Sequence, residues 1–252
     1  MNKRVGEHFK KVGEGLTTTK NKLNELKVKI SEVKNVDGST IKIVEDAIKG
    51  TNDVFDKLIA ALFKLAGVIN DGSPIGDVNF SGAPTSADKD GVEAIVVEFK
   101  KIIETATKSG IKINTGDAGA KVDNGNGMKV VVHNSQADAG AGPKLADEIA
   151  KADLWAMIDK IKNAKMDGNA FDAASAEAGA LAFGGNTQND NGTEKTNADL
   201  AAAVALKAMV KKGKFDSQAN EVVEVKAAGV SAVNKVLGIL DIIIKKTVTN
   251  NL

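Results

Sequence analysis

The side chains most often used for catalysis and metal binding are scarce in this sequence. It has two histidines, His8 and His133, and no cysteine. Neither histidine has a nearby serine and carboxylate in the arrangement of a catalytic triad. The lack of cysteine excludes disulfides, thiolate zinc sites and cysteine nucleophiles. We therefore expect no enzyme activity, no metal and no cofactor.

Two glycine-rich stretches, residues 125–127 and 184–185, invite comparison with phosphate-binding loops. Neither has the glycine spacing of a Walker A or dinucleotide-binding motif, and neither joins an apolar strand to a helix. The Asp-Asn pairs at 123–124 and 190–191 lack the glutamate that completes a calcium-binding loop. We interpret these stretches as turns.

Lysines offer a different chemistry, which is the binding of anions. Before Asp37 the chain has nine Lys or Arg and four Glu. This excess indicates either a solvated helix face or a contact surface for an anionic polymer. The candidate contact residues are Lys10, Lys11, Lys20 and Lys22.

A second lysine cluster comprises Lys207, Lys211, Lys212 and Lys214. It could bind an anion, although the last three more simply complement the negative end of a helix. The net charge of +1 and the aromatic content of 4% do not favour nucleic acid as a partner.

Apolar periodicity predicts a mainly α-helical fold. In residues 5–33, apolar positions recur at alternating steps of four and three, which is typical of a long helix with a coiled-coil-like seam. The same pattern predicts an antiparallel second helix to about residue 70, a third over about 92–106, and a final long helix after Asp216. Because the first and last helices both have such seams, we expect them to pair and to bring the termini close together.

Residues 196–213 differ from the amphipathic helices. Between Asp199 and Lys211 the only charge is Lys207, so a helix here is apolar on nearly every face and should be buried. Thr196 and Asp199 have the spacing of a capping box. Gly213 is the expected left-handed residue at the other end.

The segments between these helices are rich in glycine and polar residues. Residues 71–90, with Pro74 and Pro84, are predicted to form a surface loop. Residues 111–113 and 128–133 are short β-like runs, so a small β-hairpin or edge strand is expected there. A helix beginning near Pro143 should continue to residue 167, and a short alanine-rich helix should follow over about 171–181.

Residues 199–215, DLAAAVALKAMVKKGKF, are similar to the invariable segment of the variable large proteins, the Vlp/VlsE-like surface lipoproteins of Borrelia. The similarity continues in residues 228–238, AGVSAVNKVLG, and in the WAMI run at 155–158, which is close to the relapsing-fever members. It is residue-specific over about 200–238 and spans nearly the whole chain in layout.

The resemblance implies one helical surface-antigen ectodomain over residues 1–252. Its variable loops would lie within about 71–195 and its invariable core helix at about 197–212. In full, the expected fold is a helical bundle with long paired terminal helices, a buried central helix, and a small β-hairpin or irregular loops at the distal end. Residues 71–90, 115–142 and 184–195 are expected to form the membrane-distal surface that antibodies reach.

The resemblance also implies a location and partners. The protein would sit on the cell outer membrane through an N-terminal lipid anchor, and since no signal peptide or lipidated cysteine is seen, we interpret the chain as the mature soluble ectodomain. Host antibodies are the expected partners in antigenic variation. The alternative function is an adhesin for host glycosaminoglycans or for serum or complement proteins. A homodimer is a further way to complete the apolar seams.

Overall fold

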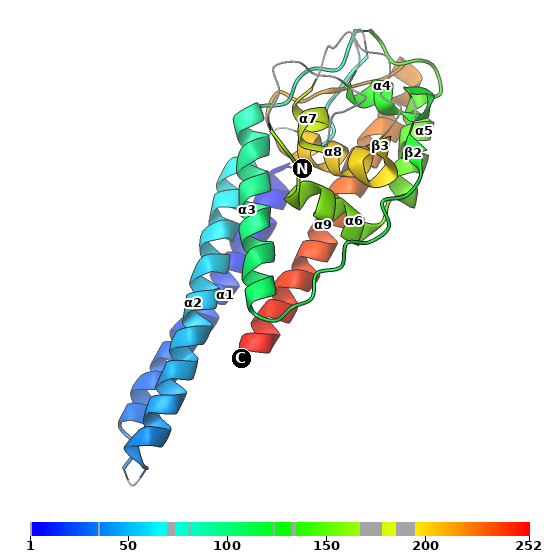
Figure 1. Cartoon of the computed structure of the whole chain (residues 1–252). Coiled ribbons are helices and arrows are strands. Elements are labelled where there is room, and N and C mark those ends of the chain that lie inside the picture. The colour runs from blue at the N-terminus through cyan, green and yellow to red at the C-terminus, as the bar shows by residue number, and fades with distance from the viewer. Residues whose placement is uncertain are drawn as a thin grey trace.

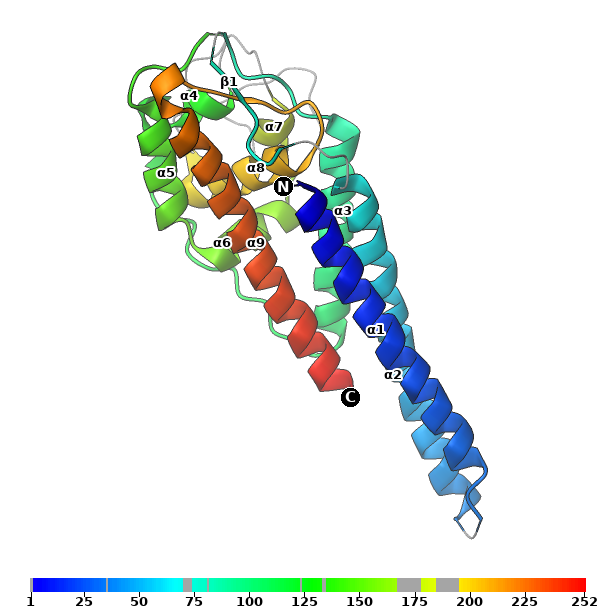
Figure 2. The ribbon, with the colours of Figure 1, turned by 180° about the vertical axis from the view of Figure 1, so that it is seen from behind.

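A long helical hairpin forms one side of the molecule. The computed structural model describes residues 2–34, 36–69, 74–80, 82–122, 124–132, 135–166, 178–184 and 195–252. Helix α1 (Asn2–Ser31) runs antiparallel to α2 (Gly38–Ile69), and the pair extends well beyond the rest of the chain (Figures 1 and 2). The prediction of two seamed antiparallel helices is confirmed.

The seam of α1 is buried only where other helices cover the hairpin. Near the start of α1, Val5 and Phe9 are 5% and 0% exposed, whereas Leu26 and Val33, further out, are 47% and 48% exposed. Phe9 packs edge-on against Phe99 of α3 (Lys89–Lys108), with 6.4 Å between ring centroids. Toward the far end of the hairpin, where the pair extends beyond the other helices, two helices alone cannot enclose an apolar stripe (Figure 1).

The other helices form a compact head beside the upper part of the hairpin. They are α3, α4 (Met128–Val131), α5 (Ala141–Lys151), α6 (Leu154–Lys162), α7 (Ala178–Phe183), α8 (Asn197–Met209) and α9 (Val222–Asn251). Short 3₁₀ turns lie at Asn124–Asn126 and Ala219–Glu221. Helix α8 lies across the head and contacts α5, α6, α7 and α9. The core is built mainly from Ala, Val, Ile and Leu.

Strands play a small part in the described residues. Strand β1 (Val78–Asn79) pairs in parallel with β4 (Phe215–Asp216), and β2 (Lys121–Val122) pairs antiparallel with β3 (Lys195–Thr196). Of the alternatives for this region, a β-hairpin between residues 111–113 and 128–133 does not form, because Met128–Val131 is helical and residues 111–113 have no strand partner. Both two-stranded sheets instead join loops to the ends of the α8 segment.

The predicted pairing of the terminal helices is also wrong. Helix α1 packs chiefly on α2, while α9 packs on α5 and α8. Helices α1 and α9 run in the same direction, and the two ends of the chain lie at different levels of the molecule (Figures 1 and 2). A contact between His8 and Asp241 joins these two helices. The seam of α1 could be satisfied by its sequence neighbour, which a short turn brings alongside.

Helix α9, with the turn before it, is the one described helix long and apolar enough to cross a membrane by length and composition. Half of its most apolar window is buried inside the protein. Central helices of folded proteins have the same apolar composition. Its burial against α5 and α8 accounts for that composition.

Candidate functional site

Helix α8 is enclosed along its whole length by the rest of the head. Every residue of Asn197–Met209 is buried. The helix begins with a capping box in which the Thr196 hydroxyl accepts from the Asp199 amide, and Asp199 Oδ2 accepts from the Thr196 amide at 3.2 Å. Lys160 of α6 lies 3.0 Å from the same carboxylate oxygen. The predictions of a buried central helix and of its N-terminal cap are confirmed.

The other end of α8 departs from the prediction. The helix ends at Met209, and the left-handed residue is Lys212, with φ 67°, rather than Gly213. Gly213 is needed for a different reason: a Cβ there would lie 2.9 Å from the Ala87 Cβ and 2.9 Å from the Lys207 Cγ. The glycine allows the chain to pass close to the buried lysine.

Lys207 is fully buried and does not belong to a surface cluster. Its Nζ donates to the carbonyl oxygens of Val131 at 2.9 Å and Gly184 at 2.8 Å. Burial lowers the pKa of Lys207 from its ordinary value of 10.5 to about 7. The alternative of an anion site formed by Lys207 with the three later lysines is therefore wrong. Lys212 and Lys214 lie beyond the helix, 3.6 Å from Asp88 and 3.1 Å from Asp77.

The predicted loops lie over and around α8, but they do not form one exposed surface. Within residues 74–90, Phe80 is 59% exposed, whereas Ile75 and Val78 are buried. Residues 115–119 run along the side of the head, where Gly116 packs against Asp153, and much of residues 127–142 is buried. Residues 185–194, most of the third predicted loop, and most of the predicted helix at 171–181 lie outside the described residues.

The region after Pro143 contains two helices instead of the predicted one. Helix α5 ends at Lys151, and Asp153 caps α6 by accepting from the amides of Trp155 at 2.8 Å and Ala156 at 2.9 Å. The apolar stripe continues across the break, so periodicity alone did not show it. The signal was Asp153 itself, an N-cap residue followed by an apolar run.

His8, the histidine that the structure describes, lies at a partly exposed contact between α1 and α9. His8 Nε2 lies 2.9 Å from Asp241 Oδ1, and both side chains are more than one third exposed. This pair links α1 to α9. His133 lies outside the described residues. Among the described residues, no cluster of three His, Cys, Asp or Glu could hold a metal ion.

The structure does not bring the four candidate lysines of α1 together. Lys20 pairs with Asp56 of α2, and Lys10 lies 3.8 Å from Glu14 one turn on. Lys11 and Lys22 are exposed on one face, eleven residues apart. At 1.5 Å per residue, that separation is about 16 Å along the helix. No compact site forms from these four residues.

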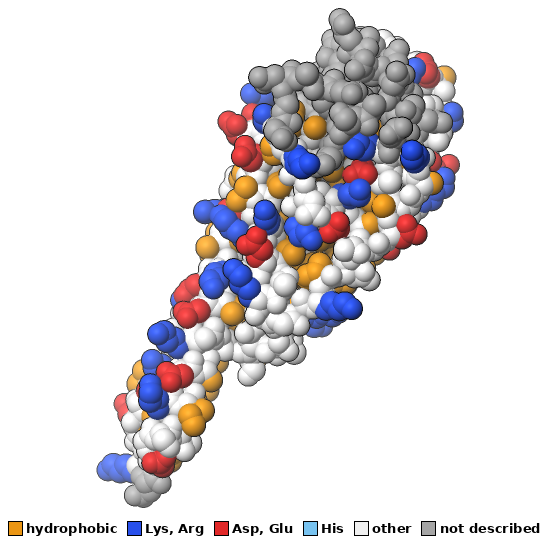
Figure 3. All heavy atoms as spheres, in the orientation of Figure 1, with side chains coloured by type: hydrophobic (Ala, Val, Ile, Leu, Met, Phe, Trp, Pro, Cys, Tyr) orange, Lys and Arg blue, Asp and Glu red, His pale blue; other side chains and the backbone are white. Residues whose placement is uncertain are grey.

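A denser group of lysines lies where α2 meets α3. A hollow of about 260 Å³ is bordered by Lys57 and Lys64 of α2 and by Lys101 and Lys108 of α3. Glu98, at its base, has a side chain 7% exposed and lies 2.8 Å from Lys101 and 3.7 Å from Lys64. The bond to Glu98 raises the pKa of Lys101. Figure 3 shows lysine and arginine side chains gathered along this flank.

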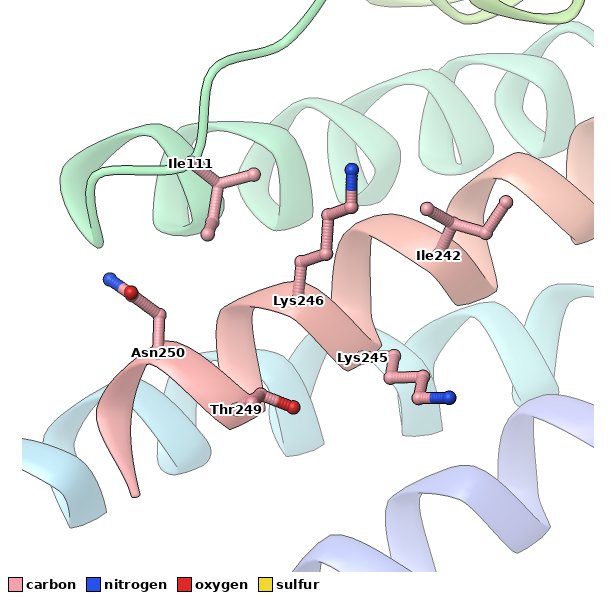
Figure 4. Close-up of a pocket in the computed structure, with 6 residues that line it drawn as sticks. All are labelled: Ile111, Ile242, Lys245, Lys246, Thr249 and Asn250. Carbon is pink, nitrogen blue, oxygen red and sulfur yellow. The ribbon is translucent and has the colours of Figure 1, made fainter.

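A second, more open hollow of about 500 Å³ lies beside the C-terminal half of α9. Lys246 extends between Ile111 and Ile242, whereas Lys245 points to another side of the helix (Figure 4). The Lys246 ammonium also lies 6.0 Å from the centre of the Trp155 ring. Its described lining residues include two lysines but no carboxylate and no histidine.

The fold is that of a known class of helical surface proteins. The chain is similar to the crystal structure of the Lyme disease variable surface antigen VlsE of Borrelia burgdorferi, with a TM-score of 0.78 and 26% identity. The match covers 99% of this chain and 84% of that chain.

The model of the Borrelia lipoprotein family matches residues 1–252. Variable large protein 14 of Borrelia hermsii is 54% identical over 256 residues, covering 99% of this chain and 71% of the relative. Variable large protein 12 of the same organism is 50% identical over 246 residues, covering 97% and 68%. The chain belongs to the Borrelia lipoprotein family, and the resemblance to the variable large proteins is confirmed.

Proposed function

We propose that the protein is a surface antigen that undergoes antigenic variation. It would be held at the outer membrane by a lipid anchor and would act without catalysis, with host antibodies as its partners. Its relatives are variable large proteins and a variable surface antigen. In this scheme the loops of the head change while the helices beneath them are kept.

The complete burial of α8 is the observation that best supports this proposal. Residues 199–215, which resemble the family's invariable segment, include the helix with the least exposed surface. A buried segment is hidden from antibody and is constrained by packing, whereas exposed loop positions tolerate substitution at little cost in stability. Burial would thus explain both why the sequence of this segment is kept and why antibodies do not reach it.

The proposal is tested with antiserum raised against cells that display this protein. We expect binding to fall strongly when the exposed head residues Phe80, Ser86, Lys121 and Ala139 are replaced together. A matched variant carries replacements at exposed residues of the hairpin, Lys42 and Lys49. Loss of binding that is equal in the two variants would contradict the proposal that the head loops carry the variable surface.

Binding of a sulfated glycosaminoglycan is a second candidate function, and the lysine-lined hollow between α2 and α3 favours it. Lys57 and Lys64 are seven residues apart on α2, as are Lys101 and Lys108 on α3. Each pair is therefore separated by about 10 Å along its helix. Glu98 neutralises part of the charge near Lys64 and Lys101, and Glu104 also borders the hollow, so we choose Lys57 and Lys108 as the anion contacts to test.

This second candidate is tested by elution from a heparin column in a salt gradient. We expect the double variant Lys57→Glu/Lys108→Glu to elute at lower salt than the unchanged protein, because exposed charge contacts weaken as salt increases. The variant Lys11→Glu/Lys22→Glu is the matched control on α1. If only the α1 variant elutes at lower salt, the heparin-binding site lies on α1, at the lysines suggested by the sequence, and not at the hollow between α2 and α3.

A further inference from the structure

Side chains from α8 and the segment that follows it bind the peptide groups of other head segments. Lys207 is fully buried, and both carbonyl oxygens that accept from its Nζ, at Val131 and Gly184, belong to the main chain. Val131 ends α4, and Gly184 follows α7 directly. One ammonium group thus joins three segments of the head.

Lys235 of α9 repeats this arrangement at the end of α5. Its Nζ donates to the carbonyl oxygens of Ile149, Ala150 and Ala152 at 2.8, 2.9 and 2.8 Å. The last carbonyls of a helix have no partner within the helix and need an external donor. Lys235 therefore fixes the C-terminal end of α5.

Two acidic side chains bind main-chain amides in the same way. Glu221 accepts from the amides of Gly140 and Gly142, the latter at 2.9 Å. Asp216 accepts from the amide of Ala137. Both acids are buried, so the segment leading into α5 is held by charged groups that are shielded from water.

Uncharged groups complete the pattern. Gln218 Nε2 donates to the Ala137 carbonyl oxygen at 2.8 Å. The main chain itself forms further bonds, because the amides of Phe215 and Ser217 donate to the carbonyl oxygens of Asp77 and Asn79 at 2.8 and 3.1 Å. At the start of α8, the amides of Asn197 and Ala198 donate to the carbonyl oxygens of Ala120 and Ala118 at 3.0 and 3.1 Å.

We infer that five side chains form a main-chain clasp: Lys207, Asp216, Gln218, Glu221 and Lys235. The clasp positions the loop-bearing segments of the head through hydrogen bonds to their main-chain groups and does not depend on their side chains. Every residue has a carbonyl group, and every residue except proline has an amide hydrogen. The clasp can therefore hold a segment whose side chains change, provided that its backbone path is kept. The inference rests on the proposed function, since it explains how one fixed frame could support many loop sequences.

The buried side-chain pairs of α8 are made with other helices, whereas the more exposed Lys212 and Lys214 pair with Asp88 and Asp77 of the loop before α3. Asn197 bonds Glu148 on α5, and Asp199 pairs with Lys160 on α6. Both partners belong to helices of the frame. Buried side-chain pairs with the loops would fail whenever a loop residue changed, because an unpaired buried polar group is costly.

Amide hydrogen exchange on the purified full chain tests the clasp. We expect Lys207→Met to raise exchange by about tenfold or more in residues 128–132 and 178–184, while α1 and α2 stay unchanged, because an opening made easier by about one buried hydrogen bond has roughly this effect. Lys226→Met, at an exposed position of α9, is the matched control. A uniform change across the chain, or none, would overturn the inference.

Lys235 supplies a second test that does not depend on a fully buried position. We expect Lys235→Met to raise exchange at the end of α5 and Lys235→Arg to restore protection, because arginine keeps the donors. If amide exchange at the end of α5 is as fast in the arginine variant as in the methionine variant, Lys235 has a packing role only and the inference fails at this site.

A third variant tests whether the clasp holds the loops when their side chains change. We expect Ser86→Glu/Lys121→Glu/Ala139→Glu to leave exchange in the head unchanged, since these side chains are exposed. Opening as large as that caused by Lys207→Met would show that loop side chains provide the anchoring. These readouts use no antibody, so they can fail or succeed independently of the proposed function.

Discussion

Burial of the Lys207 ammonium costs free energy, because surroundings without water disfavour its charged form. Its folded-state pKa of about 7 lies below the ordinary 10.5 expected in the unfolded chain. Between these values the unfolded state binds more protons, so stability should rise with pH. Below pH 7 both states hold the proton and the contribution is flat.

We therefore predict that the free energy of unfolding in urea rises between pH 7 and pH 10, by up to about 1.4 kcal/mol per pH unit from this group. In Lys207→Met this part of the rise should disappear. The same pH dependence in both proteins would show that Lys207 is not the group that titrates.

Glycines provide a second prediction at the scale of single residues. Gly127 has φ 97°, and a Cβ there would lie 2.6 Å from the Leu145 Cα. We expect Gly127→Ala to destabilise the protein by about 2 kcal/mol or more, through strain and overlap. Gly50→Ala, in an open position of α2, should instead stabilise it by about 0.5–1 kcal/mol. Urea unfolding checks both, and equal effects would contradict this explanation.

The role of Lys207 was only half visible in the sequence. A lone lysine in an apolar helix indicated that the helix is buried, but proximity to other lysines suggested an anion cluster. Its true acceptors are 76 and 23 residues away and are carbonyl oxygens. No residue type marks a carbonyl acceptor, so composition and spacing could not identify it.

At the scale of elements, helix caps determine where the head bends. Asp153 separates α5 from α6 by accepting two amide hydrogen bonds. We expect Asp153→Ala to cost about 1 kcal/mol in the free energy of unfolding, the usual value of an N-cap. Asp90→Ala, exposed in the first turn of α3, is the control and should cost less. A loss at Asp90 as large as that at Asp153 would remove the capping explanation.

Periodicity predicted the long helices well because each has one apolar stripe. It could not choose among partners, since α1, α2 and α9 all have seams of similar period. The short α1–α2 connection decided the choice by placing those helices together. Met128–Val131 was misread as β-like because valine favours strands, and a single helical turn is too short to show a period.

At the scale of the whole molecule, the class of fold followed from the sequence, and the invariable-type segment was correctly placed in the interior. The arrangement of the loops did not follow, because glycine-rich segments have no periodicity that records what they pack against. Several of those segments are held in the head by main-chain hydrogen bonds to the clasp, and no residue type in their sequence indicates such bonds.

Because this sequence has no cysteine, a single cysteine variant places one reactive thiol in it, and labelling of this protein on intact cells reports the exposure of that position. The most direct test of the account compares Ser86→Cys and Ala139→Cys, at exposed loop positions, with Ala203→Cys, which is 0% exposed in α8. With a maleimide that does not cross membranes, we predict labelling of the two loop variants on cells and labelling of Ala203→Cys only after unfolding. Labelling of Ala203→Cys on intact cells at the rate of Ser86→Cys would contradict the claim that a concealed helix supports the variable surface.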